Sequence, residues 1–273
     1  MGVLLGMLSS LSVGASEYFG RRAMNYAGAL NLAILGQGTA ALVSILLVLV
    51  VPSTFNLHDV LIGALSGIGV GVGMVAYLLG LRRSSATVVA PVVAVMVAVL
   101  PAGYVMAAGD RPSIFVFAGV VVCALGLGLV ASGVRVVGLR KGLFWGTVSG
   151  LAFGVGMTVL VETSQDSGAW PSLMQRGTAC LVSILLALGG RVSIVPTVGS
   201  RLLGTLMGVS AAGATFLYIL GVQADPLPAA VGGAMFPAVS VAVGRLAFGD
   251  EVRGWQFAGL GLVLAGITGV VAG

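Results

Sequence analysis

QGTAALVSILL at residues 37–47 and RGTACLVSILL at residues 176–186 are the same at nine of eleven positions. Other segments 139 to 141 residues apart also match, such as YLLG at 77–80 with YILG at 218–221. Similarity at one fixed spacing along most of a chain indicates an internal duplication. We therefore expect two homologous halves, residues 1–135 and 136–273, which together form one structural unit.

Both halves are too apolar for the surface of a water-soluble protein. Of 273 residues, 58% are hydrophobic and only 8% are charged, whereas soluble domains have roughly 25% charged residues. A membrane-spanning helix needs about 20 apolar residues. The chain is therefore predicted to be an all-α integral membrane protein with ten transmembrane helices, five in each half. The expected spans are 2–20, 29–51, 58–81, 86–108, 113–132, 141–161, 171–189, 199–221, 226–248 and 254–272.

The number of spans and the charges between them predict how the two halves are oriented. An odd number of spans per half makes the second half enter the membrane from the opposite side, so we expect inverted repeats. The odd-numbered connections hold ten basic residues and the even-numbered ones hold one, Arg111. The positive-inside rule then puts the odd connections in the cytoplasm and both termini outside. The expected location is the plasma (inner) membrane. The ten residues are Arg21, Arg22, Arg82, Arg83, Arg135, Arg140, Lys141, Arg191, Arg201 and Arg253.

Small residues recur at every fourth position of the first and sixth spans. The first span has Gly2, Gly6, Ser10 and Gly14, and the sixth has glycines at 142, 146, 150 and 154. Such stripes let helix backbones approach closely in a membrane, where dispersion and weak Cα–H···O contacts hold helices together. We interpret them as packing seams.

Three prolines fall inside predicted spans. Pro91 and Pro101 lie in the fourth span and Pro237 lies in the ninth. A proline within a helix removes one backbone hydrogen bond and leaves a kink with a free carbonyl. Kinks of this kind often border the substrate site of a transporter, but they also occur simply to fit a helix into its bundle. Both interpretations stay open.

Glu17 is the main ionisable residue within a predicted span. Burying a charge at mid-membrane costs at least about 2.5 kcal/mol, so such residues are usually functional. On a helical wheel Glu17 falls on the side of Gly6 and Ser10, which predicts that it faces the bundle. It could couple transport to protons or act as counter-ion to a cationic solute. The alternative is a structural pair with Arg21, four residues later.

Four further residues are candidates for a solute cavity. Arg176 lies inside the seventh span and matches Gln37 of the first half; it could bind an anionic group, or its side chain could snorkel to the membrane surface. Tyr77 and Tyr218 are equivalent in the repeat, so they should lie on facing helices. Lining of a cavity and anchoring at the membrane interface are both open for these tyrosines.

Enzymatic functions have little support in the sequence. The single histidine, His58, lies at the edge of a span and belongs to no HExxH motif. No pair of aspartates lies within the spans, and no Ser/His arrangement is available there. We expect no enzyme activity, no metal site, no cofactor and no nucleic-acid partner; the expected partners are a small solute and the lipid bilayer.

The later part of each half carries a series of short motifs. The first half has VVAP at 88–91 and GDRPS at 109–113, and the second has FP at 236–237, GDE at 249–251 and GLGLVLAG at 259–266. With these motifs the chain resembles the repeat of EamA-type members of the drug/metabolite transporter superfamily. In that family an acidic residue, commonly glutamate, follows the glycine that closes the fourth and ninth spans; Asp110 and Asp250 stand there in this chain. The resemblance implies a central cavity between the halves, alternating access and export of small molecules. Nucleotide-sugar relatives keep both termini in the cytosol, in conflict with the arginine count here.

These features predict a secondary active transporter that moves a small metabolite, amino acid or drug, with export as the expected direction. Its central site would include Glu17, Gln37, Tyr77, Arg176 and Tyr218. The alternative is a non-transporting membrane scaffold or accessory subunit, which would co-purify with a partner and move no solute in proteoliposomes. The identity of the solute, the coupling to protons, the direction of transport and self-association into oligomers stay open.

Overall fold

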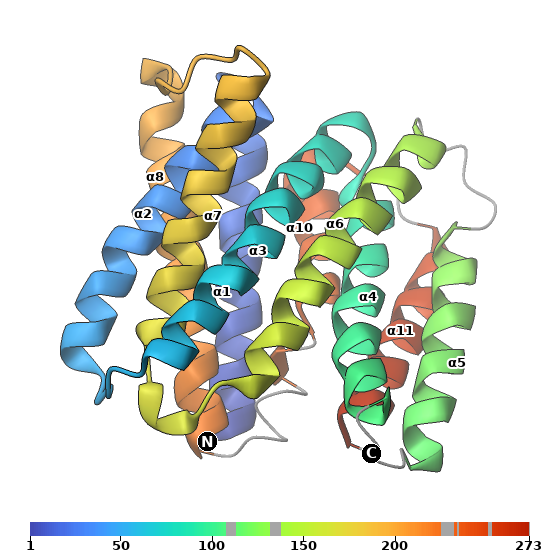
Figure 1. Ribbon diagram of the computed structural model, residues 1–273. Coiled ribbons are helices and arrows are strands. Elements are labelled where there is room, and N and C mark those ends of the chain that lie inside the picture. The colour runs from blue at the N-terminus through green and yellow to red at the C-terminus, as the bar shows by residue number, and fades with distance from the viewer. Residues whose placement is uncertain (108–112, 132–137, 225–231, 234, 251–252, 273) are drawn as a thin grey trace.

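The protein is an all-α bundle in its computed structural model, which describes residues 1–107, 113–131, 138–224, 232–233, 235–250 and 253–272 (Figure 1). No strand occurs in this part of the chain. The helices are α1 (Gly2–Ala23), α2 (Ala29–Val50), α3 (Leu57–Arg83), α4 (Ala86–Ala107), α5 (Ile114–Ala131), α6 (Leu139–Val159), α7 (Trp170–Gly189), α8 (Val198–Ala224), α10 (Phe236–Phe248) and α11 (Gly254–Ala272), with two short 3₁₀ helices, η1 (Leu160–Glu162) and η2 (Gln165–Ser167), before α7.

The described helices lie where the apolar stretches predicted them, and the predicted ninth span is described only in part. There α10 begins at Phe236, with Pro237 in its first turn. The kink at Pro237 stays a prediction, because residues 225–231 and 234 lie outside the described part of the chain. A proline in the first turn needs no kink, because its missing N–H would have had no partner there. Pro91 and Pro101 do lie inside α4, which runs through both.

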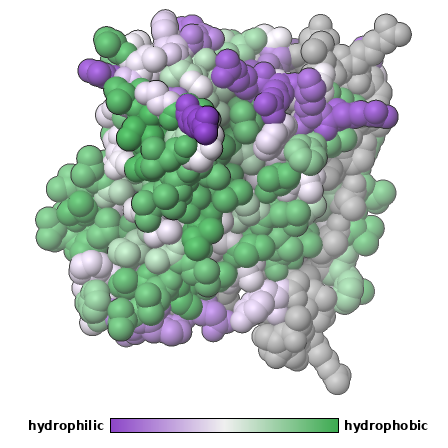
Figure 2. Space-filling model, turned by 45° about the horizontal axis from the view of Figure 1, so that its top comes forward, coloured by the Kyte–Doolittle hydropathy of each residue, from purple (hydrophilic) through white to green (hydrophobic). Residues whose placement is uncertain are grey.

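Five of the described helices are long and apolar enough to cross a membrane, and the chain thus fits an all-α membrane protein. They are Ala29–Val50, Leu57–Arg83, Leu139–Val159, Trp170–Gly189 and Val198–Gly221. The face drawn in Figure 2 has a broad apolar band, with hydrophilic residues gathered above and below it. A surface with this pattern suits a lipid environment, because only apolar side chains are stable against hydrocarbon.

Small residues let the helices pack closely, as the stripes predicted. On α6, Gly142, Gly146, Gly150 and Gly154 are buried, and a methyl group on any of them would touch a side chain of α4 or of the residues just before it. On α3, a methyl group at Gly67 would lie only 2.5 Å from the backbone oxygen of Gln175 in α7. These seams replace the hydrophobic drive that lipid cannot supply between helices.

The two ends of the bundle differ in charge. Arg21 and Arg22 close α1, and Arg82 and Arg83 close α3. Both helix ends lie at the top of Figure 1, where α6 begins and α7 ends. The opposite end carries the N-terminus, the α2–α3 connection and the segment between α6 and α7. There the backbone N–H of Thr54 donates to the carbonyl of Asp166 at 2.8 Å.

Candidate functional site

Glu17 is held between three helices near the basic end of the bundle. Its side chain is only 6% exposed. One carboxylate oxygen, Oε2, accepts hydrogen bonds from the Tyr77 hydroxyl of α3 at 2.9 Å and from the Ser240 hydroxyl of α10. The other oxygen, Oε1, is buried without a partner. The prediction that Glu17 faces the bundle is consistent with this position, and the structure adds two specific partners.

The alternative pairing of Glu17 with Arg21 is wrong. Arg21 turns instead to Asp250, just after α10, with both N–O distances at 2.9 Å. Its guanidinium also lies 4.0 Å from the centre of the Phe248 ring. Sequence reasoning missed the pairing of Arg21 with Asp250, because the two residues lie 229 positions apart in the sequence. Asp110, the matching aspartate of the first half, lies outside the described residues.

Arg176 and Gln37, which match each other in the repeat, lie together in the structure. The Arg176 guanidinium donates to Gln37 Oε1 at 3.1 Å and to the Thr215 hydroxyl of α8 at 2.8 Å. Its Nε and the Nε2 of Gln37 are buried without hydrogen-bond partners. No carboxylate in the described part of the chain pairs with this cation. The side chain is directed between α2 and α8, so the snorkelling interpretation does not describe this conformation.

Tyr218 lies apart from both groups. Its side chain is 40% exposed, and its ring lies against Gly233, where an added methyl group would be 2.9 Å from Cε2. The predicted central site is therefore not one cluster in this conformation. Glu17 with Tyr77 forms one polar group, and Arg176 with Gln37 forms another.

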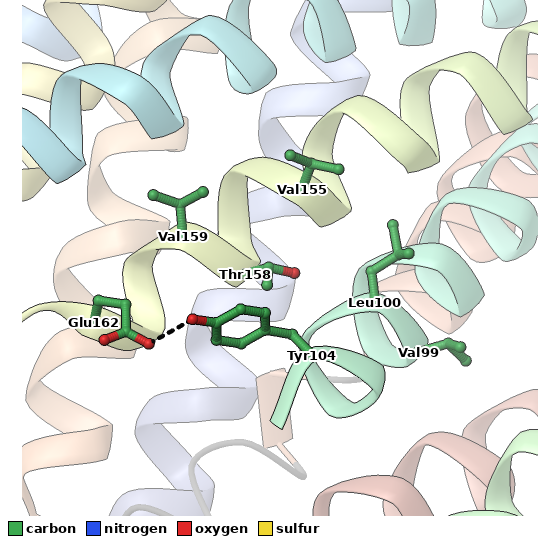
Figure 3. A pocket seen from close by; sticks show the side chains of 7 residues that line it. All are labelled: Val99, Leu100, Tyr104, Val155, Thr158, Val159 and Glu162. Atoms are coloured by element: carbon green, nitrogen blue, oxygen red, sulfur yellow. Dashed lines mark hydrogen bonds between the residues drawn. The ribbon is translucent and has the colours of Figure 1, made fainter. Parts of the chain in front are cut away.

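A cavity of about 580 Å³ lies between α4 and α6, toward the end of the bundle opposite the arginines. Figure 3 shows its residues: the side chains from α4 and α6 form apolar walls, and Tyr104 reaches across to Glu162. The Tyr104 hydroxyl donates to Glu162 Oε1 at 3.0 Å. The described residues that line it are Val99, Leu100, Tyr104, Val155, Thr158, Val159 and Glu162.

Sequence reasoning missed the residues of this cavity. The sequence pointed to neither Glu162, a single carboxylate just after the predicted sixth span, nor Tyr104, a single tyrosine in the predicted fourth span, as a site residue. Ser240 and Thr215 were also missed, because single hydroxyl residues are common in membrane helices. A useful signal would have been the pairing of a polar residue on one span with a carboxylate on another.

Comparison with known proteins gives a fold but no family. No family model matches the chain, and no curated protein matches it. Solved structures do resemble it; one, described only as the crystal structure of a protein, superposes with a TM-score of 0.66 at 13% identity over 99% of this chain and 96% of the other. At this identity the likeness concerns the fold alone.

Proposed function

We propose that the chain is a secondary active transporter of the EamA type, which moves a small metabolite, amino acid or drug across the plasma (inner) membrane by alternating access. Its ten spans would form two inverted halves, with the arginine-rich end in the cytoplasm. The observation that carries the proposal is a difference between two helix seams. One seam is closed by an ion pair, and the seam that corresponds to it in the repeat contains a cavity.

The correspondence follows from the repeat spacing. A shift of about 140 residues relates α1 to α6, α3 to α8 and α4 to α10. Helix α1 packs on α8 and on α10, and correspondingly α6 packs on α3 and on α4. Each contact thus has its counterpart in the other half. This arrangement supports two halves of the same fold with opposite orientation.

The two equivalent seams differ in how they are closed. Between α1 and α10, Arg21 binds Asp250 at the arginine-rich end, and Glu17 binds Ser240 deeper in the bundle. Between α6 and α4, the cavity of about 580 Å³ reaches Tyr104 and Glu162 at the opposite end. A transporter that is closed on one side and open on the other needs this combination. Exchange of the two arrangements would open the α1–α10 seam and close the α4–α6 seam.

Glu17 is the residue that we propose for coupling to protons. It lies behind the Arg21–Asp250 pair, on the seam that must open, and two hydroxyl groups hold its carboxyl group in place. Opening of α10 away from α1 would separate Glu17 from Ser240. A change of the partners of a buried carboxyl group changes how strongly it holds a proton. The movement and the proton would therefore be linked.

The test is solute flux in proteoliposomes with an imposed pH gradient, screened over amino acids, small metabolites and cationic, neutral and anionic drugs. We expect the wild-type protein to accumulate at least one solute, and Glu17→Gln to abolish accumulation while protein yield is unchanged. Asp166→Asn is the matched control, because Asp166 is exposed and belongs to neither seam. Absence of flux across the whole panel would overturn the proposal. If Glu17→Gln keeps the full pH-dependent flux, proton coupling at this residue is wrong.

A further inference from the structure

We propose that the α4–α6 cavity is a binding site for amphipathic organic cations, in which Glu162 and Tyr104 hold the positive group and the valine walls hold the apolar body. The inference names the solute class for the transport proposed above, and to that extent it rests on it. It stands on the shape of the cavity, on the chemistry of its lining and on the charges at this end of the bundle.

The walls of the cavity suit an apolar body. Five of its seven lining residues have no charge and no hydroxyl group that is free to donate: Val99, Leu100, Val155 and Val159 are aliphatic, and the Thr158 hydroxyl already donates to the carbonyl of Gly154 at 2.8 Å. A volume of about 580 Å³ lies within the range of drug-sized sites, about 300–1,000 Å³. A small hydrophilic solute would leave these apolar side chains exposed to water, so the lining favours a ligand with a hydrocarbon part.

The polar end of the cavity suits a positive charge. Among the described residues that line the cavity, Glu162 alone carries a charge. Tyr104 uses its hydroxyl to donate to Glu162 Oε1, while the other oxygen, Oε2, makes no hydrogen bond or ion pair in the described part of the chain. A cation can therefore approach the free oxygen without displacing tyrosine. The aromatic ring beside the carboxylate can add a cation–π contact.

The surroundings favour the same sign of charge. Asp59 and Asp166 lie near Glu162 on this side, joined to the α6–α7 segment. Ser164 donates its backbone N–H to Asp59 Oδ2 at 3.1 Å, and the Asp166 carbonyl accepts from Thr54. The only basic side chain of the described residues close to them is His58, which contacts Asp59. The field at this mouth should attract cations and repel anions.

The experiment measures equilibrium binding of phenyltrimethylammonium to the full-length protein in nanodiscs of uncharged lipid, with empty nanodiscs as background. Its charge is permanent, so the protonation of the ligand plays no part. The neutral isostere tert-butylbenzene has a carbon in place of the nitrogen, and benzenesulfonate is the anion of similar size. We expect the cation to bind, the isostere to bind less tightly and the anion not to bind.

Variants then assign the site. Glu162→Gln should weaken binding of the cation about fivefold and leave binding of the isostere unchanged, as expected for loss of a partly exposed charge pair. Tyr104→Leu should weaken it by about the same factor through loss of the ring, and Val155→Phe should weaken both ligands by filling the cavity. Asp166→Asn is the charge-matched comparison: it removes the same charge from a residue that does not line the cavity, so it should weaken binding of the cation much less than Glu162→Gln does. Glu162 and Asp166 are both exposed, so these exchanges should leave folding intact, and the melting temperature checks this.

Two results would overturn the inference. If cation and isostere bind equally and Glu162→Gln changes neither, the cavity is an apolar site for a lipid chain. If the cation does not bind while another solute is transported, the cation site is wrong but the transport function stands. Conversely, binding with the expected variant pattern in a protein that moves no solute would reject transport alone.

Discussion

Arg21 and Asp250 form a two-pronged ion pair that joins the end of α1 to the end of α10. Both N–O distances are 2.9 Å, and the two side chains are only 10% and 11% exposed. The Phe248 ring covers the guanidinium from one side. Two parallel charge-assisted hydrogen bonds fix distance and orientation together. The pair therefore holds the α1–α10 seam closed at the arginine-rich end.

Breaking this pair should weaken the closed conformation. Asp250→Asn leaves Arg21 with little compensation in a largely buried place, which we expect to cost about 2–4 kcal/mol and to lower the melting temperature in detergent. The exchanged double variant Arg21→Asp/Asp250→Arg should recover part of the loss. Arg22→Gln is the control. Arg22 has no ion pair in the described part of the chain, and its guanidinium lies 5.7 Å from the centre of the Tyr18 ring. Equal losses for Asp250→Asn and Arg22→Gln would contradict the account.

Tyr77 and Tyr218 should differ sharply although they are equivalent in the repeat. Tyr77→Phe removes one of the two donors to the buried Glu17 carboxyl group, and we expect it to destabilise the protein by about 1–3 kcal/mol. Tyr218→Phe removes a hydroxyl that makes no hydrogen bond within the described residues, and should be neutral. Thermal unfolding of both variants in the same detergent measures the difference. A neutral Tyr77→Phe would mean that the hydroxyl does not support Glu17.

Arg176 is expected to reduce stability in its present surroundings. Its cation has two neutral partners and a buried, unpaired Nε, and Gln37 has an unpaired Nε2. Replacing both by leucine removes every unpaired group at once, which should raise the unfolding free energy by about 1–3 kcal/mol. Solute flux should fall if the pair serves transport, because stability and activity often trade off at functional sites.

The control for this pair is Arg201→Leu, at an exposed position in the first turn of α8. It should change neither melting temperature nor flux. A lower melting temperature for the Arg176→Leu/Gln37→Leu double variant would show that the two side chains are well compensated in the protein.

Replacement by alanine should have opposite effects on stability at two glycines of the neighbouring helices α3 and α7. At Gly67 the new methyl group would meet the Gln175 backbone oxygen at 2.5 Å and Thr178 Cβ at 2.6 Å, and backbone atoms cannot move aside. We expect a loss of about 1–3 kcal/mol. At Gly177 nothing lies within 4 Å, so alanine should stabilise α7 by up to about 1 kcal/mol. Similar melting temperatures for both variants would exclude a tight α3–α7 seam.

The sequence was sufficient to predict the helices because the signal is local. Apolar stretches separated by charged or proline-containing breaks predicted the helix positions, and four-residue spacing of glycines predicted the seams. The start of α10 could not be found this way, since Pro237 is compatible with either a kink inside a helix or a first turn. Only the surrounding packing distinguishes the two.

The site was predictable only in part because its contacts join distant residues. Repeat equivalence named Gln37 and Arg176 as candidates without predicting their contact, and the helical wheel predicted that Glu17 faces the bundle. Neither argument could choose between Arg21 and Tyr77 as the partner of Glu17, since a nearby charge four residues away looked sufficient. In the structure Asp250, from the other half of the chain, binds Arg21, so Arg21 is not the partner of Glu17. The α4–α6 cavity depends on side-chain shape, which composition does not report.

Coupled access to the two seams is the central claim, and cysteine labelling measures it most directly. In a background with Cys123→Ala and Cys180→Ala, Val159→Cys reports on the α4–α6 cavity. Val243→Cys, which lies 3.5 Å from the position of a methyl group on Gly14, reports on the α1–α10 seam. A membrane-impermeant maleimide should label residue 159 fast and residue 243 slowly when Arg21 and Asp250 are intact.

Asp250→Asn should then raise the labelling rate at residue 243 and lower it at residue 159, because alternating access makes one opening exclude the other. The change at residue 159 is decisive, since this residue lies at the other end of the bundle from the substituted aspartate. A faster rate at residue 243 with an unchanged rate at residue 159 would contradict the account, because the ion pair would then only hold one helix end in place.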